Sequence, residues 1–163
     1  MNVLELKSIL LAEDDPHDVE LTMMAFAKCN IANDVVCVGD GAAALDYIYR
    51  RGAFAGRSAG NPAVVLLDIK MPKVDGLEVL RQLKSDDELK VIPVVILTSS
   101  REDRDLLESY RLGVNAYVVK PLRFGEFADA VSALGVFWAL INEPPLGSRP
   151  GRGSFPTKEP TGV

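Results

Sequence analysis

The chain has 163 residues, of which 48% are hydrophobic and 25% are charged, and its formal net charge is −5 at pH 7. This length suits one ordinary domain with its own hydrophobic core. The acidic balance argues against a nucleic-acid surface, because phosphate binding requires clustered lysine and arginine side chains. No apolar run is long enough to span a bilayer, and the first residues lack the pattern of a signal peptide, so we expect no membrane association.

The two cysteines and the single histidine give weak signals. Cys29 and Cys37 are too few for a disulfide framework and form no CxxC pair, so we interpret both as packing residues of a reduced, cytoplasmic protein. His17 cannot form a metal site alone. A phosphorylated histidine is one interpretation of it, and an exposed residue in the first turn of a helix is the favoured one.

Short apolar runs alternate with segments of helical periodicity. The run 8–12 predicts a buried strand that ends in acids. In the helix that follows, Pro16 suits the first turn, and we interpret Asp15 as the helix cap in preference to a third acid of a site. Further strands are predicted at 34–41 (with its closing turn), 63–68, 92–98 and 115–121, and further helices at 42–51, 76–84, 102–112 and 124–142.

Five predicted strands thus alternate with five predicted helices. The strands are nearly continuous apolar runs, which is typical of a parallel sheet covered by helices on both faces, so we predict an open α/β fold. Two segments lie outside the repeat. The connection 50–62 is longer than most in compact domains, and the proline- and glycine-rich segment 143–163 predicts a flexible tail with no output domain.

Acids and their expected partners follow the strands. In an open α/β sheet, ligands bind beyond the carboxyl ends of the strands, and at these ends stand Glu13, Asp14, Asp68, Thr98 and Lys120. If the first and third strands are neighbours, their acids repel one another unless a cation lies between them. Such oxygen ligands suit Mg²⁺. A nearby lysine and hydroxyl would neutralise and position a phosphoryl group, which an aspartate can accept as an acyl phosphate.

Four motifs at these strand ends carry a family resemblance. They are the acids Glu13 and Asp14, "LLDIKMPKVDG" around Asp68, "LTSS" after the fourth strand and "YVVKP" in the fifth. Together they resemble the receiver domain of two-component response regulators over residues 7–142. The resemblance implies a flavodoxin-like (βα)5 sheet of strand order 2-1-3-4-5. It also implies a sensor histidine kinase as partner, and a phosphoacceptor with only self-directed chemistry instead of an enzyme.

The resemblance assigns a metal site and a phosphoacceptor. Asp68 would be phosphorylated, Asp14 would bind Mg²⁺ directly, and Glu13 would hold metal-bound water. The backbone carbonyl of Lys70 would complete the Mg²⁺ shell. The family often has Asn, Asp or Met at the position of Lys70, so its cationic side chain could alter the lifetime of the phosphoryl group.

The same resemblance assigns the contacts of the phosphoryl oxygens. Thr98 would supply a hydroxyl and Lys120 an ammonium, and the Lys120–Pro121 peptide would be cis. Tyr117 matches the aromatic residue that turns inward as the threonine engages phosphate. The alternative for Tyr117 is half-buried packing on a terminal strand.

The last predicted helix carries more apolar residues than one face needs. A core-facing stripe is predicted for Phe124, Phe127, Val131, Leu134, Trp138 and Ile141. Val136, Phe137 and Leu140 fall off that stripe, and we interpret them as part of a homodimer interface, the alternative being that the tail covers them. This helix, the connection 50–62 and "EDDPHDVELT" resemble the stand-alone receivers that serve bacterial phytochromes.

Two other functions compete with a phosphorylated receiver. A phosphatase of the haloacid dehalogenase kind would place its nucleophile after the first strand in a DxD arrangement, whereas that strand here ends in "EDDP". A receiver-shaped interaction module that is never phosphorylated usually lacks an acid or the lysine, and neither is missing here.

Overall fold

The computed structural model describes residues 7–121 and 123–136, and within them strands and helices alternate along the chain. The strands are β1 (Ile9–Ala12), β2 (Val35–Val38), β3 (Val64–Leu67), β4 (Val94–Thr98) and β5 (Ala116–Val119). The α-helices are α1 (Pro16–Lys28), α2 (Gly41–Tyr49), α3 (Gly76–Ser85), α4 (Asp103–Leu112) and α5 (Phe124–Val136), and a 3-10 turn, η1, spans Gly52–Phe54. Within the described residues the predicted strands and helices are confirmed, with most strands one to three residues shorter than expected, and residues 137–142 of the last predicted helix lie outside the description.

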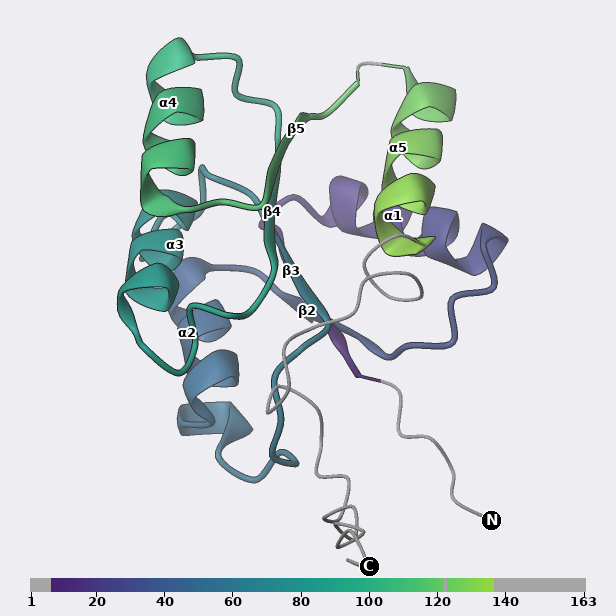
Figure 1. The fold of residues 1–163 in the computed structure, drawn as a ribbon. Coiled ribbons are helices and arrows are strands. Elements are labelled where there is room, and N and C mark those ends of the chain that lie inside the picture. Colours follow the sequence, from purple (N-terminus) through teal and green to yellow (C-terminus); the bar gives the residue numbers. More distant parts are fainter. Residues whose placement is uncertain (1–6, 122, 137–163) are drawn as a thin grey trace, which may run out of the picture.

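The strands form one parallel sheet in the order β2-β1-β3-β4-β5 (Figure 1), as predicted. Ala12 at the end of β1 lies beside Leu67 at the end of β3, and Leu67 in turn lies beside Ile96 of β4. The carboxyl ends of β1, β3 and β4 therefore stand together at one edge of the sheet. This is where an open α/β sheet places its ligands.

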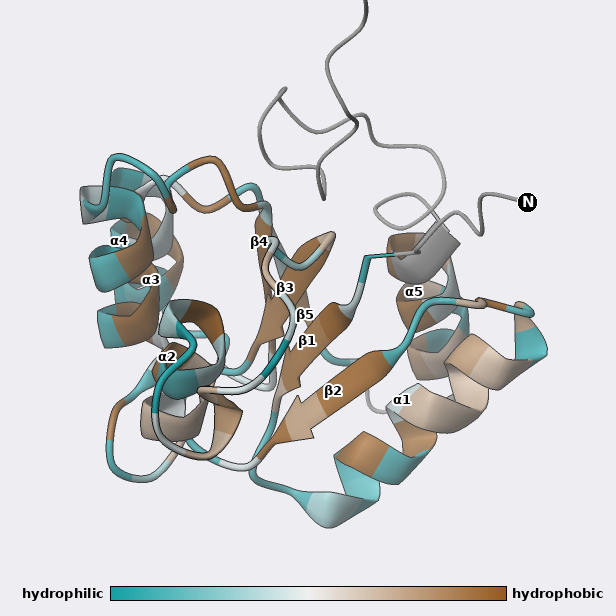
Figure 2. Cartoon of the chain, turned by 90° about the horizontal axis from the view of Figure 1, so that it is seen from below, coloured by the Kyte–Doolittle hydropathy of each residue, from teal (hydrophilic) through white to brown (hydrophobic). Residues whose placement is uncertain are grey.

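Helices cover both faces of the sheet. Helices α2, α3 and α4 lie on one face, and α1 and α5 lie on the other (Figures 1 and 2). Successive strand residues point to opposite faces: Leu10 belongs to the core under α2 and α3, whereas Ile9 belongs to the core under α1 and α5. Because both faces are covered, β1 and β3 are buried along their whole length.

Aspartates begin three of the helices. Asp15 accepts a hydrogen bond from the backbone N–H of His17 at 2.9 Å and Pro16 occupies the first helical turn, which confirms the capping role predicted for Asp15. Asp40 and Asp75 cap α2 and α3 in the same way. These caps fix where the helices start, and so where the strand-to-helix loops of the site lie.

The long connection 50–62 is anchored by an arginine. The guanidinium of Arg57 lies 4.3 Å from the ring centroid of Tyr47, and it donates to the backbone carbonyls of Tyr47 and Ile48 at the end of α2.

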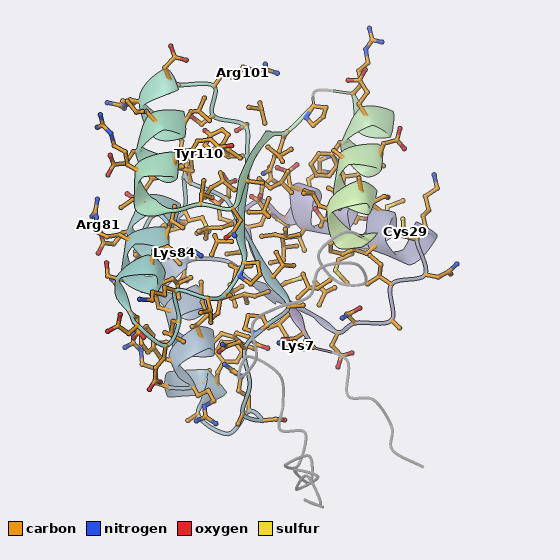
Figure 3. All side chains as sticks on the ribbon, viewed as in Figure 1. Lys7, Cys29, Arg81, Lys84, Arg101 and Tyr110 are labelled. Atoms are coloured by element: carbon orange, nitrogen blue, oxygen red, sulfur yellow. The ribbon has the colours of Figure 1, made fainter. Side chains whose placement is uncertain are left out.

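On the opposite edge of the same helical layer, Arg81 of α3 reaches Glu108 of α4 at 3.7 Å on the outer surface (Figure 3). Neither contact approaches the carboxyl ends of the strands.

Two expectations are wrong. No cis peptide bond occurs in the described ranges, so Lys120–Pro121 is trans and not cis as expected. The trans isomer of a bond before proline is intrinsically favoured by about 0.5–1 kcal/mol. The second wrong expectation is that Cys37 is a packing residue. Cys37 is exposed on β2, the outermost strand of the sheet, whereas Cys29 is half-buried after α1 (Figure 3).

In the part of the chain that the structure describes, every helix is too short or too polar to cross a bilayer.

Candidate functional site at the carboxyl ends of the strands

Three acids meet at the edge of the sheet where β1 and β3 end. One carboxylate oxygen from each of Glu13, Asp14 and Asp68 lies within 4.8 Å of the others. Glu13 and Asp68 are buried and Asp14 is exposed. The sequence prediction that these acids converge is confirmed, because the parallel pairing of β1 with β3 brings their carboxyl ends together.

Asp68 is held by hydrogen bonds on both of its carboxylate oxygens. Its Oδ1 accepts from the Thr98 hydroxyl at 2.7 Å and from the backbone N–H of Ile69 at 2.7 Å. Its Oδ2 accepts from the Lys120 ammonium at 3.1 Å. The carboxylate is thereby fixed in one orientation, in a place that water reaches poorly.

Gly76 sets the backbone course beside Asp68. The Gly76 N–H donates to the carbonyl of Ile69 at 2.7 Å, and a Cβ at position 76 would lie only 2.0 Å from the backbone oxygen of Asp68. A side chain there would displace either the start of α3 or the loop that follows β3. The glycine is therefore part of how the sequence positions the acid.

Lys120 lies among three carboxylates. Its Nζ donates to Glu13, to Asp18 at 2.8 Å and to Asp68 at 3.1 Å. Burial acts to lower the pKa of Lys120, but the hydrogen bonds to Asp18 and Glu13 and the charge of Asp68 outweigh it and raise the pKa above its ordinary value. The lysine is therefore a permanent cation that neutralises part of the acidic cluster.

Sequence reasoning did not find Asp18. An acid in the first turn of a helix is ordinarily explained by the helix dipole, and nothing in the local sequence pattern points to residue 120. The structure brings Asp18 to Lys120 because α1 begins directly after β1, at the same edge of the sheet.

Burial opposes the ionisation of Glu13. The pKa of Glu13 is raised to about 7, mainly by burial. The hydrogen bond from Lys120 lowers this pKa, and the charge of Asp68 raises it further. Crowded carboxylates of this kind favour the arrival of a positive charge. A proton or a metal cation would relieve the same repulsion.

The donor set fits a hard divalent cation. Three carboxylates, one of them open to water, match the oxygen ligands and retained waters that Mg²⁺ prefers. The ammonium of Lys70 is exposed and lies 3.8 Å from Glu102 at the start of α4. Its side chain therefore points to the rim of the site, and the ligand role of the Lys70 carbonyl stays a prediction.

Tyr117 and Thr98 contact the same residue, Ser100. The Tyr117 hydroxyl donates to the backbone carbonyl of Ser100 at 3.1 Å, and the Ser100 N–H donates to the Thr98 hydroxyl at 3.3 Å. The Tyr117 ring is half-buried, and burial raises the pKa of its hydroxyl. The two predicted switch residues are thus joined through the β4–α4 loop; their switching role stays a prediction.

The predicted dimer interface lies at the end of α5 and beyond it. Phe137 and Leu140 lie outside the described residues, and the side chain of Val136, the last residue of α5, is outside the description too. Within α5, Phe127 and Val131 are buried against the sheet, which confirms that part of the core-facing stripe.

Comparison with known proteins identifies a family. Residues 9–132 match the model of the response regulator receiver domain. The probable methanogenesis regulatory protein FilR2 of Methanothrix harundinacea is 42% identical over 137 residues, which cover 84% of this chain and 86% of FilR2. The response regulator Rcp1 of Synechocystis is 35% identical over 132 residues, or 81% of this chain and 88% of Rcp1.

Two solved structures share the fold. The bacteriophytochrome response regulator AtBRR is 60% identical, with a TM-score of 0.69, and the match covers 85% of this chain and 99% of that one. The Mn²⁺-bound form of Rcp1 superposes with a TM-score of 0.79 at 34% identity, over 85% of this chain and 99% of that one.

Proposed function

Since the chain belongs to the family of response regulator receiver domains, we propose that its Asp68 accepts a phosphoryl group from a phosphohistidine of a sensor histidine kinase. One observation carries this proposal. The Asp68 carboxylate is buried beside Glu13 and Asp14 and is hydrogen-bonded by both Thr98 and Lys120. A strand end stabilised by an ordinary turn would require none of these partners.

The proposed step is a transfer between two side chains. A carboxylate oxygen of Asp68 attacks phosphorus, the O–P bond forms as the P–N bond of the phosphohistidine breaks, and the departing imidazole nitrogen keeps the electron pair and takes up a proton. Thr98 and Lys120 orient the attacking carboxylate and offer donors to the phosphoryl oxygens. Hydrolysis of the acyl phosphate resets the protein, so the chemistry is self-directed and there is no turnover of an external substrate.

We propose Mg²⁺ as the cation of this site. Glu13, Asp14 and Asp68 would hold it, with the backbone carbonyl of Lys70 as a further ligand. When bound, the ion neutralises charge that develops on the phosphoryl oxygens. The Mn²⁺-bound form of Rcp1 supports a divalent cation in this family.

The partner kinase is proposed to be of the bacterial phytochrome type. The 60% identity to a bacteriophytochrome response regulator supports this assignment. FilR2 is the counter-example, because it is 42% identical and its name points to another system, the regulation of methanogenesis. The two assignments differ in the kinase that phosphorylates Asp68, and not in the chemistry at Asp68.

Phosphorylation is proposed to signal through the edge of the sheet. A phosphoryl group on Asp68 would draw the Thr98 hydroxyl away from the carboxylate, and Ser100 links that hydroxyl to Tyr117. The affected surface would be the one formed by α4, β5 and α5. A change in homodimerisation through Val136, Phe137 and Leu140 is the proposed output in a cytoplasmic setting.

Incubation with acetyl phosphate and Mg²⁺, followed by intact mass measurement, tests the function. We expect a gain of one phosphoryl group that disappears in Asp68→Asn and with a chelator. Asp87→Asn is the matched control, because Asp87 is a fully exposed acid distant from the cluster. No gain in the wild-type protein would leave an interaction module, and turnover of a phosphate monoester that depends on Asp14 but not Asp68 would indicate a phosphatase.

A further inference from the structure

Asp18 makes a contact in the site that the proposed transfer does not use. Its Oδ2 lies 2.8 Å from the Nζ of Lys120, and 25% of the Asp18 side chain is exposed, against 8% for Lys120. The backbone around Asp18 is fixed, since the hydroxyl of the buried Thr22 donates to the Asp18 carbonyl at 2.7 Å. A fixed and largely covered acid of helix α1 thus contacts Lys120.

The ammonium of Lys120 has three N–H donors, and three carboxylates surround it: Glu13, Asp18 and Asp68. Two of these acids have another task. Glu13 and Asp68 belong to the cluster that fits a cation, and among the described residues that cluster does not include Asp18. Once a cation and a phosphoryl group engage Glu13 and Asp68, Asp18 is still available to Lys120.

We propose that Asp18 is a positioning residue for phosphoryl transfer: it holds one donor of the Lys120 ammonium and so keeps the other two directed at the phosphoryl oxygens on Asp68. This inference rests on the proposed function of Asp68. Lysine side chains have many rotamers, and an ammonium held by a single fixed acid loses less freedom during the reaction than one that must find its place.

The charge of Asp18 acts in the opposite direction to its positioning effect. A carboxylate near the site repels an anionic phosphodonor, so removal of that charge would by itself accelerate phosphorylation. Removal of the positioning contact slows it. The sign of the rate change in Asp18→Asn therefore distinguishes the two effects.

The rate of phosphorylation by acetyl phosphate at saturating Mg²⁺ is the first measurement. We expect Asp18→Asn to be slower by about tenfold, the lower end of the loss found when a partner that orients an active group is removed. Asp18→Glu keeps the acid and recovers part of the rate. Glu20→Gln is the matched control, because Glu20 is an exposed acid on the same helix and forms no ion pair within the described chain.

The Lys120→Met background separates positioning from a general loss of structure. If Asp18 acts through Lys120, Asp18→Asn causes no further loss of rate once Lys120 is absent, since the two effects are not additive. A further tenfold loss in that background would overturn the inference. So would an unchanged or faster rate of Asp18→Asn in the wild-type background.

A second measurement does not depend on phosphorylation. The NMR signal of the Lys120 ammonium in metal-free protein, assigned by its loss in Lys120→Arg, reports how firmly the group is held. We expect this signal to broaden in Asp18→Asn through faster proton exchange, and to persist in Glu20→Gln. If the wild-type protein takes up no phosphoryl group, the proposed function fails, and an ammonium signal unchanged in Asp18→Asn then overturns the inference on its own.

Discussion

The two sides of the site are held with different firmness. The central side consists of the ends of β1 and β3 with Glu13 and Asp68, on strands that are buried along their whole length. The edge side consists of the β4–α4 loop and β5 with Tyr117, on a terminal strand whose residues are all half-buried. Asp68 accepts three hydrogen bonds from its surroundings, whereas one joins the Tyr117 hydroxyl to Ser100.

This difference matches the two tasks of a receiver. Phosphoryl transfer requires a carboxylate, a hydroxyl and an ammonium in fixed positions. The buried strands β3 and β4 position Asp68 and Thr98, whereas Lys120, at the end of β5, is held by the three carboxylates around it. A response to phosphorylation requires an element that moves at low cost, and elements with few buried contacts move most easily. The proposed phosphoacceptor thus lies at the centre of the sheet, and the proposed response lies at its edge.

Gly76→Ala breaks the central side and has the largest expected effect. Its Cβ would meet the backbone oxygen of Asp68 at 2.0 Å, and backbone cannot yield as a flexible side chain can. We expect the free energy of unfolding to fall by about 3 kcal/mol, measured by urea denaturation. In the control Gly125→Ala nothing lies within 4 Å of the new Cβ, so there we expect a gain of about 0.5 kcal/mol from helix propensity. Equal effects of the two substitutions would contradict a rigid central side.

The pH dependence of stability tests the charge balance of the central side. Folding raises the pKa of Glu13 from 4.5 to about 7, mainly by burial. The contribution of Glu13 to the free energy of unfolding is therefore full below pH 4.5 and is lost as the pH rises through about 7. In the presence of a chelator we expect a loss of at most about 3 kcal/mol over this range.

Glu13→Gln is the control for that titration, because glutamine keeps the shape of the side chain and does not ionise. Its free energy of unfolding is expected to lack the fall between pH 4.5 and about 7. A wild-type protein whose stability rises over the same range would show that Lys120, not burial, dominates the ionisation of Glu13.

Much of this central side could be predicted from the sequence. Apolar runs that end in Glu13, Asp68 and Thr98 locate buried strands, and parallel pairing then forces their ends together. The contact between Asp18 and Lys120 could not be predicted, because it joins residues 102 positions apart, and its geometry depends on how α1 leaves β1. The exposure of Cys37 was missed because an apolar run predicts a strand but does not show which of its side chains a neighbouring helix covers; Val38 in the same strand is buried.

Thr98→Val keeps the shape of the side chain and removes its hydroxyl, which donates to Asp68 and accepts a longer hydrogen bond from the Ser100 N–H at 3.3 Å. The hydroxyl donates to the buried Asp68 carboxylate at 2.7 Å, and loss of a hydrogen bond to a charged group costs about 2 kcal/mol. We expect that fall in the free energy of unfolding at pH 8 in chelator. Thr98→Ser keeps the hydroxyl and is expected to lose only about 1 kcal/mol, for the missing methyl group. Serine and valine variants of equal stability would mean that the bond to Asp68 contributes nothing.

Tyr117→Phe probes the edge side and has the smallest expected effect. It removes the hydroxyl that donates to the Ser100 carbonyl at 3.1 Å, and the ring stays in its half-buried place, so we expect a loss of about 1 kcal/mol in urea denaturation. Tyr110→Phe is the matched control, since Tyr110 is 55% exposed on the surface of α4 (Figure 3) and no hydrogen bond of its hydroxyl occurs in the described chain. If Tyr117→Phe cost as much as Thr98→Val, the edge would be held as firmly as the centre. Moving Tyr117 would then cost more free energy than the loss of its one hydrogen bond to Ser100. A signal from Asp68 would in that case have to leave the site through another element.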